Sequence, residues 1–268
     1  MDSPLVMGIL NVNRDSFYAG SRMSSIELIL QNANKMVEDG ADILDIGGQS
    51  TRPGSELISV EKELERTIPA IEVVKKNFPE SLISVDTFYS KVAKDAVAAG
   101  ASMVNDISGG QMDEEMISTA SSLGVPYICT HIKGTPQDMI ANANYHDVTK
   151  EVLEYFVGKI DDCRRAGIRD LIIDPGFGFA KNADHNFILL KNLNVFRIAE
   201  IPIMVGLSRK STIYKTLQTT PEKALNGTTV LHTLALINGA DILRVHDVKE
   251  AREVVTMVQR YQENSRLI

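Results

Sequence analysis

Polar side chains of the kinds used in catalysis and ligand binding recur at the ends of short apolar segments. Carboxylates and carboxamides follow the earlier segments and cations follow the last two: Asn11, Asp45, Asp86, Asn105, Asp106, His131, Asp174, Ser208, Arg209, Lys210, Arg244 and His246. A single Asp in such a place is more often a helix cap than a catalyst. Gathered at one site, however, the set suits a ligand with a hydrogen-bonding heterocycle at one end and an anionic group at the other.

The segments that carry these residues have the pattern of buried strands. They are short and lack alternation of apolar and polar residues, which is typical of strands buried on both faces. The expected strands are Leu5–Leu10, Asp42–Ile46, Leu82–Val85, Met103–Asn105, Tyr127–Thr130, Leu171–Ile173, Ile203–Val205 and Ile242–Val245. Amphipathic helical patterns separate them, and Ser24 and Glu27 are spaced as a capping box for the first.

Glycines mark the ends of five of the helical patterns, each just before a strand: Gly40, Gly100, Gly124, Gly167 and Gly239. This is the place where a helix favours a left-handed residue. Eight strand–helix units without a linker predict one α/β domain over residues 1–268, a (β/α)8 TIM barrel. A doubly wound open sheet has the same local pattern and is the alternative. In a barrel, all eight strand ends meet at one mouth, where active sites lie.

Composition limits the class of partner. The chain has 28 Lys and Arg against 35 Asp and Glu, a net charge of −7, which argues against nucleic acid and anionic lipid as partners. No apolar run approaches the ~18 residues of a membrane span, and we expect no signal peptide. We therefore expect a cytoplasmic protein acting on small molecules. Its two cysteines, Cys129 and Cys163, are expected to be buried, reduced thiols.

Eight sequence blocks, in the same order, resemble those of the dihydropteroate synthase family of pterin-binding enzymes. They are Met7–Val12 with Asp15–Phe17, Asp45–Gly54, Ser84–Thr87, Val104–Gly110, His131–Pro136, Asp174–Phe179, Gly206–Ser211 and Arg244–Val248. The resemblance implies a transferase of folate biosynthesis that condenses 6-hydroxymethyl-7,8-dihydropterin pyrophosphate with 4-aminobenzoate. The products would be 7,8-dihydropteroate and pyrophosphate, formed by a dissociative displacement. The resemblance also implies a homodimer and a target of sulfonamides.

The pterin part of this substrate can be matched to particular positions. A pterin presents adjacent N–H donors, which a carboxylate accepts in pairs, and we assign this contact to Asp174. Asn105 both donates and accepts, so it can bind another edge of the ring, with Asp86 supporting the polar rim. Lys210 should donate to the carbonyl or N5 side. A helix-capping role remains an alternative for Asp86 and, less so, for Asp174.

The pyrophosphate leaving group needs cations and donors. Arg244 and His246, two residues apart at a strand end, can point the same way into the mouth, and Arg52 can close over it from a loop. Asn11 offers an oxygen ligand for Mg²⁺, the expected cofactor. Lys210, Arg52, Arg244 and His246 are thus the residues expected to assist catalysis.

The carboxylate of 4-aminobenzoate needs a donor site. Ser211 lies where the helix after the seventh strand begins, and free N–H groups there favour anions. Thr51, Pro53 and Phe179 are expected to pack around the benzene ring. His131 is either a ligand contact or a structural residue near the pocket floor.

The first loop departs from the family pattern at Asn13, Arg14, Tyr18 and Ala19. Arg14 stands where the family commonly has proline, and Ala19 where it has a carboxylate. We therefore expect loop closure and turnover, rather than ligand recognition, to differ. Two other functions stay open: a pterin-binding methyltransferase acting on methyltetrahydrofolate, and a catalytically impaired pterin-binding paralogue. The methyltransferase would share the strand-end Asp and Asn residues but would not need the cations.

Overall fold

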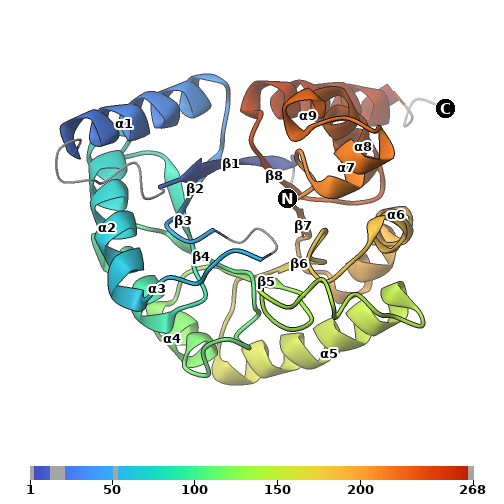
Figure 1. Cartoon of the computed structure of the whole chain (residues 1–268), viewed down its shortest axis with the longest axis horizontal. Coiled ribbons are helices and arrows are strands. Elements are labelled where there is room, and N and C mark those ends of the chain that lie inside the picture. Colours follow the sequence, from blue (N-terminus) through green and yellow to red (C-terminus); the bar gives the residue numbers. More distant parts are fainter. Residues whose placement is uncertain (1–2, 13–21, 51–53, 265–268) are drawn as a thin grey trace.

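Eight parallel strands form one sheet in the computed structural model of the chain, which describes residues 3–12, 22–50 and 54–264 (Figure 1). The strands are β1 (Leu5–Asn11), β2 (Ile43–Gly47), β3 (Leu82–Asp86), β4 (Met103–Asp106), β5 (Tyr127–Thr130), β6 (Leu171–Asp174), β7 (Met204–Val205) and β8 (Ile242–Val245). Their order is β6-β5-β4-β3-β2-β1-β8-β7, and a bridge between Ile173 and Ile203 joins the two ends. The predicted barrel is confirmed, and the open sheet is wrong.

Helices surround the strands on all sides in Figure 1. They are α1 (Arg22–Glu38), α2 (Val60–Asn77), α3 (Ser90–Ala99), α4 (Met116–Leu123), α5 (Val148–Ala166), α6 (Ala183–Lys191), the 3₁₀ helix η2 (Leu193–Ala199), α7 (Ser211–Thr216), the 3₁₀ helix η3 (Pro221–Lys223), α8 (Leu225–Ile237) and α9 (Val248–Asn264). Within the described ranges, no helix is both long and apolar enough to cross a membrane.

The local signals in the sequence are confirmed with one exception. All five glycines expected to stop helices have positive φ, between 63° and 120°. Every predicted strand boundary lies within one residue of the observed one. The exception is the capping box at Ser24, because α1 begins two residues earlier and Ser24 lies in its first turn. Arg22 and Met23 are good helix formers, so the helix extends past the predicted cap.

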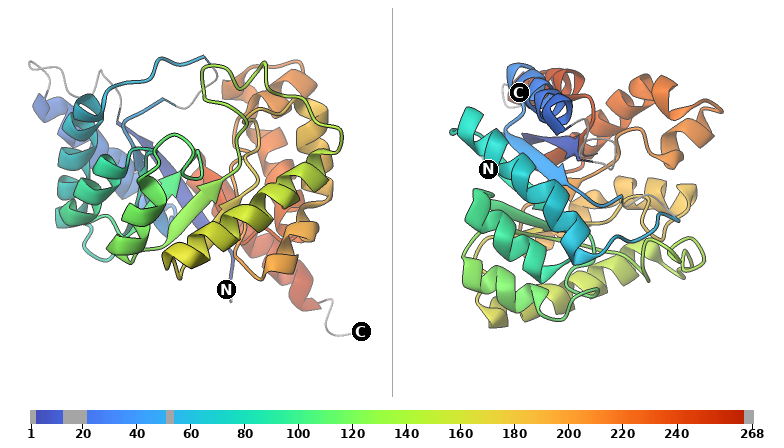
Figure 2. Two further views of the ribbon diagram at one scale, coloured as in Figure 1. Left: turned by 90° about the horizontal axis from the view of Figure 1, so that it is seen from below. Right: turned by 60° about the vertical axis from the view of Figure 1, so that its left-hand side comes forward.

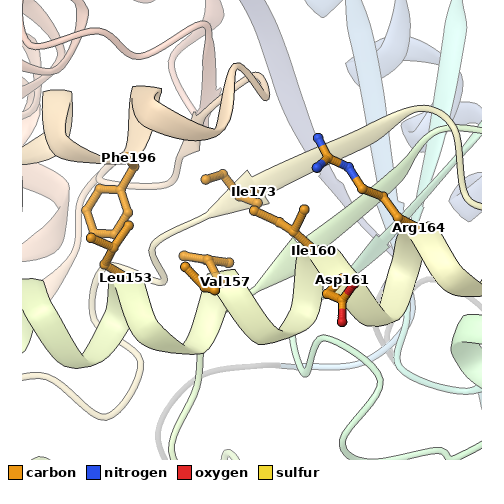
Figure 3. A pocket seen from close by; sticks show the side chains of 8 residues that line it. Leu153, Val157, Ile160, Asp161, Arg164, Ile173 and Phe196 are labelled. Carbon is orange, nitrogen blue, oxygen red and sulfur yellow. The ribbon is translucent and has the colours of Figure 1, made fainter.

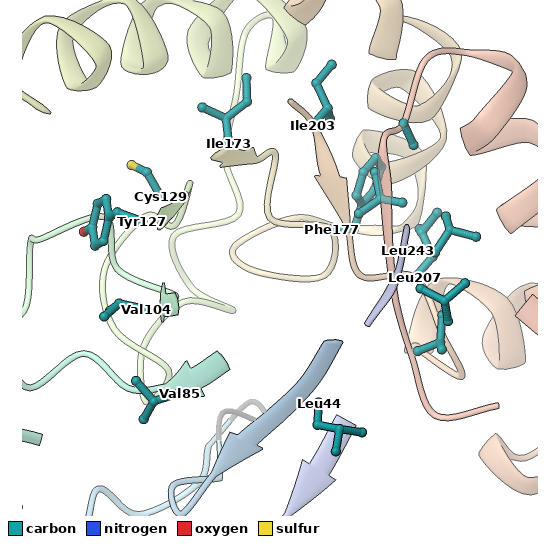
Figure 4. Packing of buried hydrophobic residues seen from close by; sticks show 14 of the residues in the cluster. Leu44, Val85, Val104, Tyr127, Cys129, Ile173, Phe177, Ile203, Leu207 and Leu243 are labelled. Atoms are coloured by element: carbon teal, nitrogen blue, oxygen red, sulfur yellow. The ribbon is translucent and has the colours of Figure 1, made fainter. Parts of the chain in front are cut away.

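Alternate residues of each strand face opposite sides of the barrel wall. The outward-facing ones, among them Leu44, Val85 and Leu243, pack against the helices in the main core (Figure 4). Cys129 and Cys163 are buried free thiols in this core, as predicted.

The inward-facing residues change character along the barrel axis. At one level lies a separate apolar cluster, which we call the apolar ring: Met7, Ile43, Met103, Ile128, Ile172, Met204 and Ile242. Asp45, Asn105, Asp174 and Arg244 each lie two residues beyond a member of the apolar ring on the same strand. Asp86 on β3 pairs with Asn105 in register. We call these five residues the polar ring. The loops after β2 and β5 extend beyond this end of the barrel (Figure 2). The polar ring therefore lies at the mouth.

A small apolar hollow of about 250 Å³ lies on the outer wall, between α5 and η2 (Figure 3). Its lining is Leu153, Phe156, Val157, Ile160, Asp161, Arg164, Ile173 and Phe196. Ile173 faces outward, whereas its neighbours Ile172 and Asp174 face the barrel interior. The hollow is thus separated by the strand wall from the polar ring.

Candidate active site

Arg244 joins three strands of the polar ring. Its guanidinium lies 2.6 Å from Asp45 Oδ2 and 2.5 Å from Asp86 Oδ2. The same oxygen of Asp45 accepts a hydrogen bond from Asn105 Nδ2 at 3.1 Å. Nε and Nη2 make these contacts, which leaves Nη1 as the guanidinium nitrogen without a partner among the described residues. Arg244 therefore serves first as the counter-ion of two buried carboxylates.

Burial dominates the electrostatics of this group. Only 6% of the Asp86 side chain and none of the Asp45 side chain is exposed. Burial raises the pKa of Asp86, the Arg244 charge opposes that rise, and the neighbouring Asp45 adds to it. The alternative that Asp86 caps the next helix is wrong, because the N–H of Ser90, the first residue of α3, is bonded by Asp113 at 2.7 Å.

Asp174 and Lys210 bring opposite charges to another part of the mouth. Asp174 is buried, and its Oδ1 accepts a hydrogen bond from the Gly176 N–H at 2.8 Å. A Cβ atom on Gly206 would lie 3.6 Å from Lys210 Nζ and 4.0 Å from Asp174 Oδ2, so this glycine leaves the space where the two charges converge. Burial lowers the pKa of Lys210 to about 8, and the carboxylate of Asp174 opposes the change.

Lys210 also connects this pair to the loop after β6. Its ammonium donates to the carbonyl of Phe177 and lies 4.6 Å from the centroid of the Phe179 ring. Phe179 is buried in a small apolar cluster at the mouth that includes Phe88, Ile107 and Ile132. The residues predicted for the pterin and for the benzene ring are thus neighbours through Lys210.

Three buried polar atoms of the mouth have no hydrogen-bond partner among the described residues: Asp45 Oδ1, Ser84 Oγ and Asn105 Oδ1. They come from the adjacent strands β2, β3 and β4 and face the barrel interior. Buried polar groups are normally bonded, so such acceptors suit the N–H donors of a heterocycle. Of these residues, only Asn105 is a ligand contact expected from the sequence; Asp45 and Ser84 are not. Asp45 follows Ile43 of the apolar ring by two residues, and Ser84 pairs with Asp45 in the register of β2 and β3, so both face the same side of the wall.

The cations after β7 and β8 do not all reach the mouth. The guanidinium of Arg209 makes two 2.8 Å contacts with Asp247 and donates to the carbonyls of Pro221 and Glu222, so it is used in the fold. His246 is exposed at the rim, with Nδ1 3.0 Å from Ser208 Oγ. Partial burial and the charge of Arg244 lower the pKa of His246, so the ring is neutral at pH 7 and can bind an anion only as an N–H donor.

The remaining predicted residues lie at or near the mouth where they are described. Asn11 is exposed at the end of β1, and Ser211 is the first residue of α7. Thr51, Arg52 and Pro53 fall outside the described residues, as do the first-loop positions Asn13, Arg14, Tyr18 and Ala19. Their roles stay predictions.

Two strand-end residues have structural roles. His131 is buried and its Nδ1 lies 2.8 Å from Lys181 Nζ, which supports the structural alternative. Asp106 accepts hydrogen bonds from Ser108, Gly110 and the Tyr127 hydroxyl on the outer side of the wall.

A preformed metal site is absent from the described ranges, where no three His, Cys, Asp or Glu side chains are placed so that they could hold a metal ion. Asn11 offers one exposed carboxamide oxygen at the mouth. This donor set fits Mg²⁺ held mainly by substrate phosphates and water.

The chain is similar to several proteins of known activity. A family profile described as pterin binding enzyme matches residues 7–246. The dihydropteroate synthase of Escherichia coli (strain K12) is 41% identical over 261 residues, covering 97% of this chain and 92% of that protein. The structure of Xanthomonas albilineans dihydropteroate synthase with 4-aminobenzoic acid has a TM-score of 0.90 at 40% identity, covering 97% of this chain and 94% of that one. The Yersinia pestis enzyme in complex with a sulfonamide drug has a TM-score of 0.91 at 38% identity, covering 97% and 95%.

Proposed function

Because the chain belongs to the dihydropteroate synthases of the pterin-binding enzyme family, we infer that it condenses 6-hydroxymethyl-7,8-dihydropterin pyrophosphate with 4-aminobenzoate. The products are 7,8-dihydropteroate and pyrophosphate, and the protein is a transferase of folate biosynthesis. The observation that carries this conclusion is the similarity at 41% identity over nearly the whole chain. It favours the synthase over the methyltransferase and over the impaired paralogue.

We propose that the polar ring binds the pterin. The Asp174 carboxylate accepts two adjacent N–H donors of the ring, and Lys210 donates to its carbonyl or N5 side. The unpartnered oxygen of Asn105 accepts from another edge. Asp86 supports the pterin site indirectly, because its carboxylate accepts a hydrogen bond from the Arg244 guanidinium. Burial at this site excludes water and so strengthens each of these contacts.

Loss of pyrophosphate is the step at which the cations act. The C–O bond to the pterin methylene breaks, the pyrophosphate takes the electron pair, and the ring stabilises the resulting cation. The neutral amine of 4-aminobenzoate then attacks the methylene and loses a proton. We propose that Arg52, the free Nη1 of Arg244 and a neutral His246 hold the departing anion, with Lys210 close by. Asn11 would hold Mg²⁺, which supplies charge to offset the phosphates when it is bound.

We propose that 4-aminobenzoate lies beside the loop after β6. Phe179 would pack on the benzene ring together with Thr51 and Pro53, and Ser211 at the start of α7 would bind the carboxylate. The Yersinia pestis relative is known with a sulfonamide drug, so we expect sulfonamides to inhibit this chain in competition with 4-aminobenzoate.

We further propose that two copies of the chain form a homodimer through the helices on one side of the barrel. Large apolar side chains are exposed on neighbouring helices there: Phe187 on α6, Leu217 after α7, and Val230, Leu234 and Ile237 on α8. The three on α8 share one helical face. Sedimentation should show a dimer, and Leu234→Lys should shift it toward monomer. The matched control, Met257→Lys, changes an exposed side chain of α9 and should not.

A cytoplasmic location is also proposed. Both cysteines are free, as in a protein of a reducing compartment. Fractionation of the source cells would test it.

The experiment that tests the function is release of pyrophosphate by the purified protein. With both substrates and Mg²⁺, pyrophosphate and dihydropteroate should appear in equal amounts. Omitting 4-aminobenzoate should abolish dihydropteroate formation. No product with both substrates would favour the impaired paralogue, and methyl transfer from methyltetrahydrofolate would favour the methyltransferase.

A further inference from the structure

Lys181 is a buried lysine that takes no part in the proposed chemistry. It directly follows the loop after β6, and only 8% of the residue is exposed. Its ammonium lies 3.1 Å from the Gly176 carbonyl oxygen, 3.0 Å from the Phe179 carbonyl oxygen and 2.8 Å from His131 Nδ1. The His131 carbonyl oxygen, at 3.5 Å, is a fourth and longer contact. An ammonium has three N–H donors, so these acceptors use its full capacity. Among the described residues, no carboxylate lies within ion-pair distance of Lys181.

The loop that these contacts hold is tightly wound. Gly176, Gly178 and Ala180 all have positive φ, at 72°, 80° and 49°. A Cβ atom on Gly176 would lie 2.0 Å from the carbonyl oxygen of His131, so the loop is pressed against the end of β5. This winding turns the carbonyls of Gly176 and Phe179 toward one point, which the ammonium of Lys181 occupies.

Through this loop, Lys181 is connected to both substrate sites. The Gly176 N–H donates to Asp174 Oδ1 at 2.8 Å, while its carbonyl accepts from Lys181. Phe179 accepts from Lys181 through its backbone, and its ring lies beside Lys210. The residue expected to bind the pterin and the residue expected to pack on 4-aminobenzoate are therefore held through the hydrogen bonds of one buried lysine.

We propose that Lys181 is a positioning residue that sets the orientation of the Asp174 carboxylate and the Phe179 ring together. The inference rests on the proposed function, because that function assigns these two side chains to the two substrates. Without the ammonium, the inward carbonyls lose their donors and the loop is free to unwind. Both substrates should then bind less well, although the barrel itself is built from other contacts.

The test is Lys181→Met, which keeps a long side chain and removes the donors. We expect at least a tenfold rise both in the Kd for the pterin, measured by calorimetry, and in the KM for 4-aminobenzoate, with an unchanged far-ultraviolet circular dichroism spectrum. Lys133→Met is the matched control, because Lys133 donates hydrogen bonds to Glu151 and to the Asn144 carbonyl and to none of the described residues 174–180. Its two constants should stay within twofold of the parent's.

A purely structural role for Lys181 predicts a different pattern. The thermal midpoint or the fraction of active sites would then fall while the Kd and the KM stay unchanged, and that result would overturn the proposal. Lys181→Gln, which retains two N–H donors, should lie between the parent and Lys181→Met. If neither variant folds, the positioning role is also overturned, because the lysine is then needed for the fold itself.

Failure of this inference can be told apart from failure of the proposed function. If Asp174→Asn weakens pterin binding and Lys181→Met does not, only the positioning role is wrong. If neither variant changes pterin binding, the assignment of Asp174 is wrong as well.

Discussion

The interior of the barrel has two levels with opposite physical character. Ile172 and Ile242 belong to the apolar ring, and two residues further along the same strands stand Asp174 and Arg244 of the polar ring. The strand geometry is the same at both levels, so the difference comes from side-chain type alone. In the apolar ring, the strand side chains pack together and fill the barrel interior. In the polar ring, they present charged groups to the mouth.

The two levels also differ in what they contribute to stability. Each fully buried side chain of the apolar ring contributes about 1.5–3 kcal/mol by leaving water. The polar ring works against folding, since burial raises the pKa of both Asp86 and Asp174. Arg244 and Lys210 offset this cost. The barrel therefore gains stability from the apolar ring, and this gain offsets the cost of burying the charges of the polar ring.

Removal of Arg244 should have the largest effect on stability. Arg244→Ala leaves Asp45 and Asp86 buried without their cation, which we expect to lower the free energy of unfolding by about 3–5 kcal/mol. Denaturant titration would measure the loss. Arg244→Lys keeps a charge but cannot bridge both carboxylates as a guanidinium does, so its loss should be smaller.

The same variants show whether Arg244 also contacts the leaving group. Binding of the pterin pyrophosphate should weaken more than binding of the free pterin. Equal losses for the two ligands would limit Arg244 to holding the polar ring together.

A cavity in the apolar ring should affect stability and nothing else. We expect Ile172→Ala to lower the free energy of unfolding by about 2–4 kcal/mol, because it removes buried methyl groups and leaves a cavity. The Kd for the pterin should remain within about twofold of the parent's. A tenfold loss of pterin affinity would show that the two levels are not independent.

The barrel can be predicted from the sequence because the patterns that indicate strands and helix ends involve only neighbouring residues. Strand ends and the five helix-stopping glycines depend on neighbouring residues, and they are found where expected. The contacts of Arg244 could not be predicted, since Arg244 and Asp45 are 199 positions apart and meet only when the barrel closes. Lys181 was missed for the same reason. Its role depends on carbonyl groups turned toward it by the loop, and no residue type reveals those.

Glu63 on α2 shows what a buried carboxyl does without a close cation. It is fully buried, and neither of its oxygens has a hydrogen-bond partner in the part of the chain that the structure describes. Burial raises its pKa from 4.5 to about 8. The folded state therefore holds this proton more tightly than the unfolded state. Its contribution to stability is complete below about pH 4.5 and is lost as the pH rises through about 8.

Glu63→Gln should remove this pH dependence, with a smaller effect than the two preceding variants. Between about pH 6 and 8, the parent's free energy of unfolding should fall by about 2 kcal/mol more than the variant's. Chemical denaturation at the two pH values measures the difference. Parallel curves would mean that Glu63 is ionised in the folded protein.

Calorimetric titration of Asp174→Asn with the pterin tests the separation of the two levels most directly. The amide keeps an acceptor for the Gly176 N–H but turns its amino group toward the ligand's donors. We predict a loss of pterin affinity of about 100-fold, equivalent to about 2.7 kcal/mol, with the free energy of unfolding within about 1 kcal/mol of the parent's. Unchanged pterin affinity would contradict the assignment of pterin binding to the polar ring.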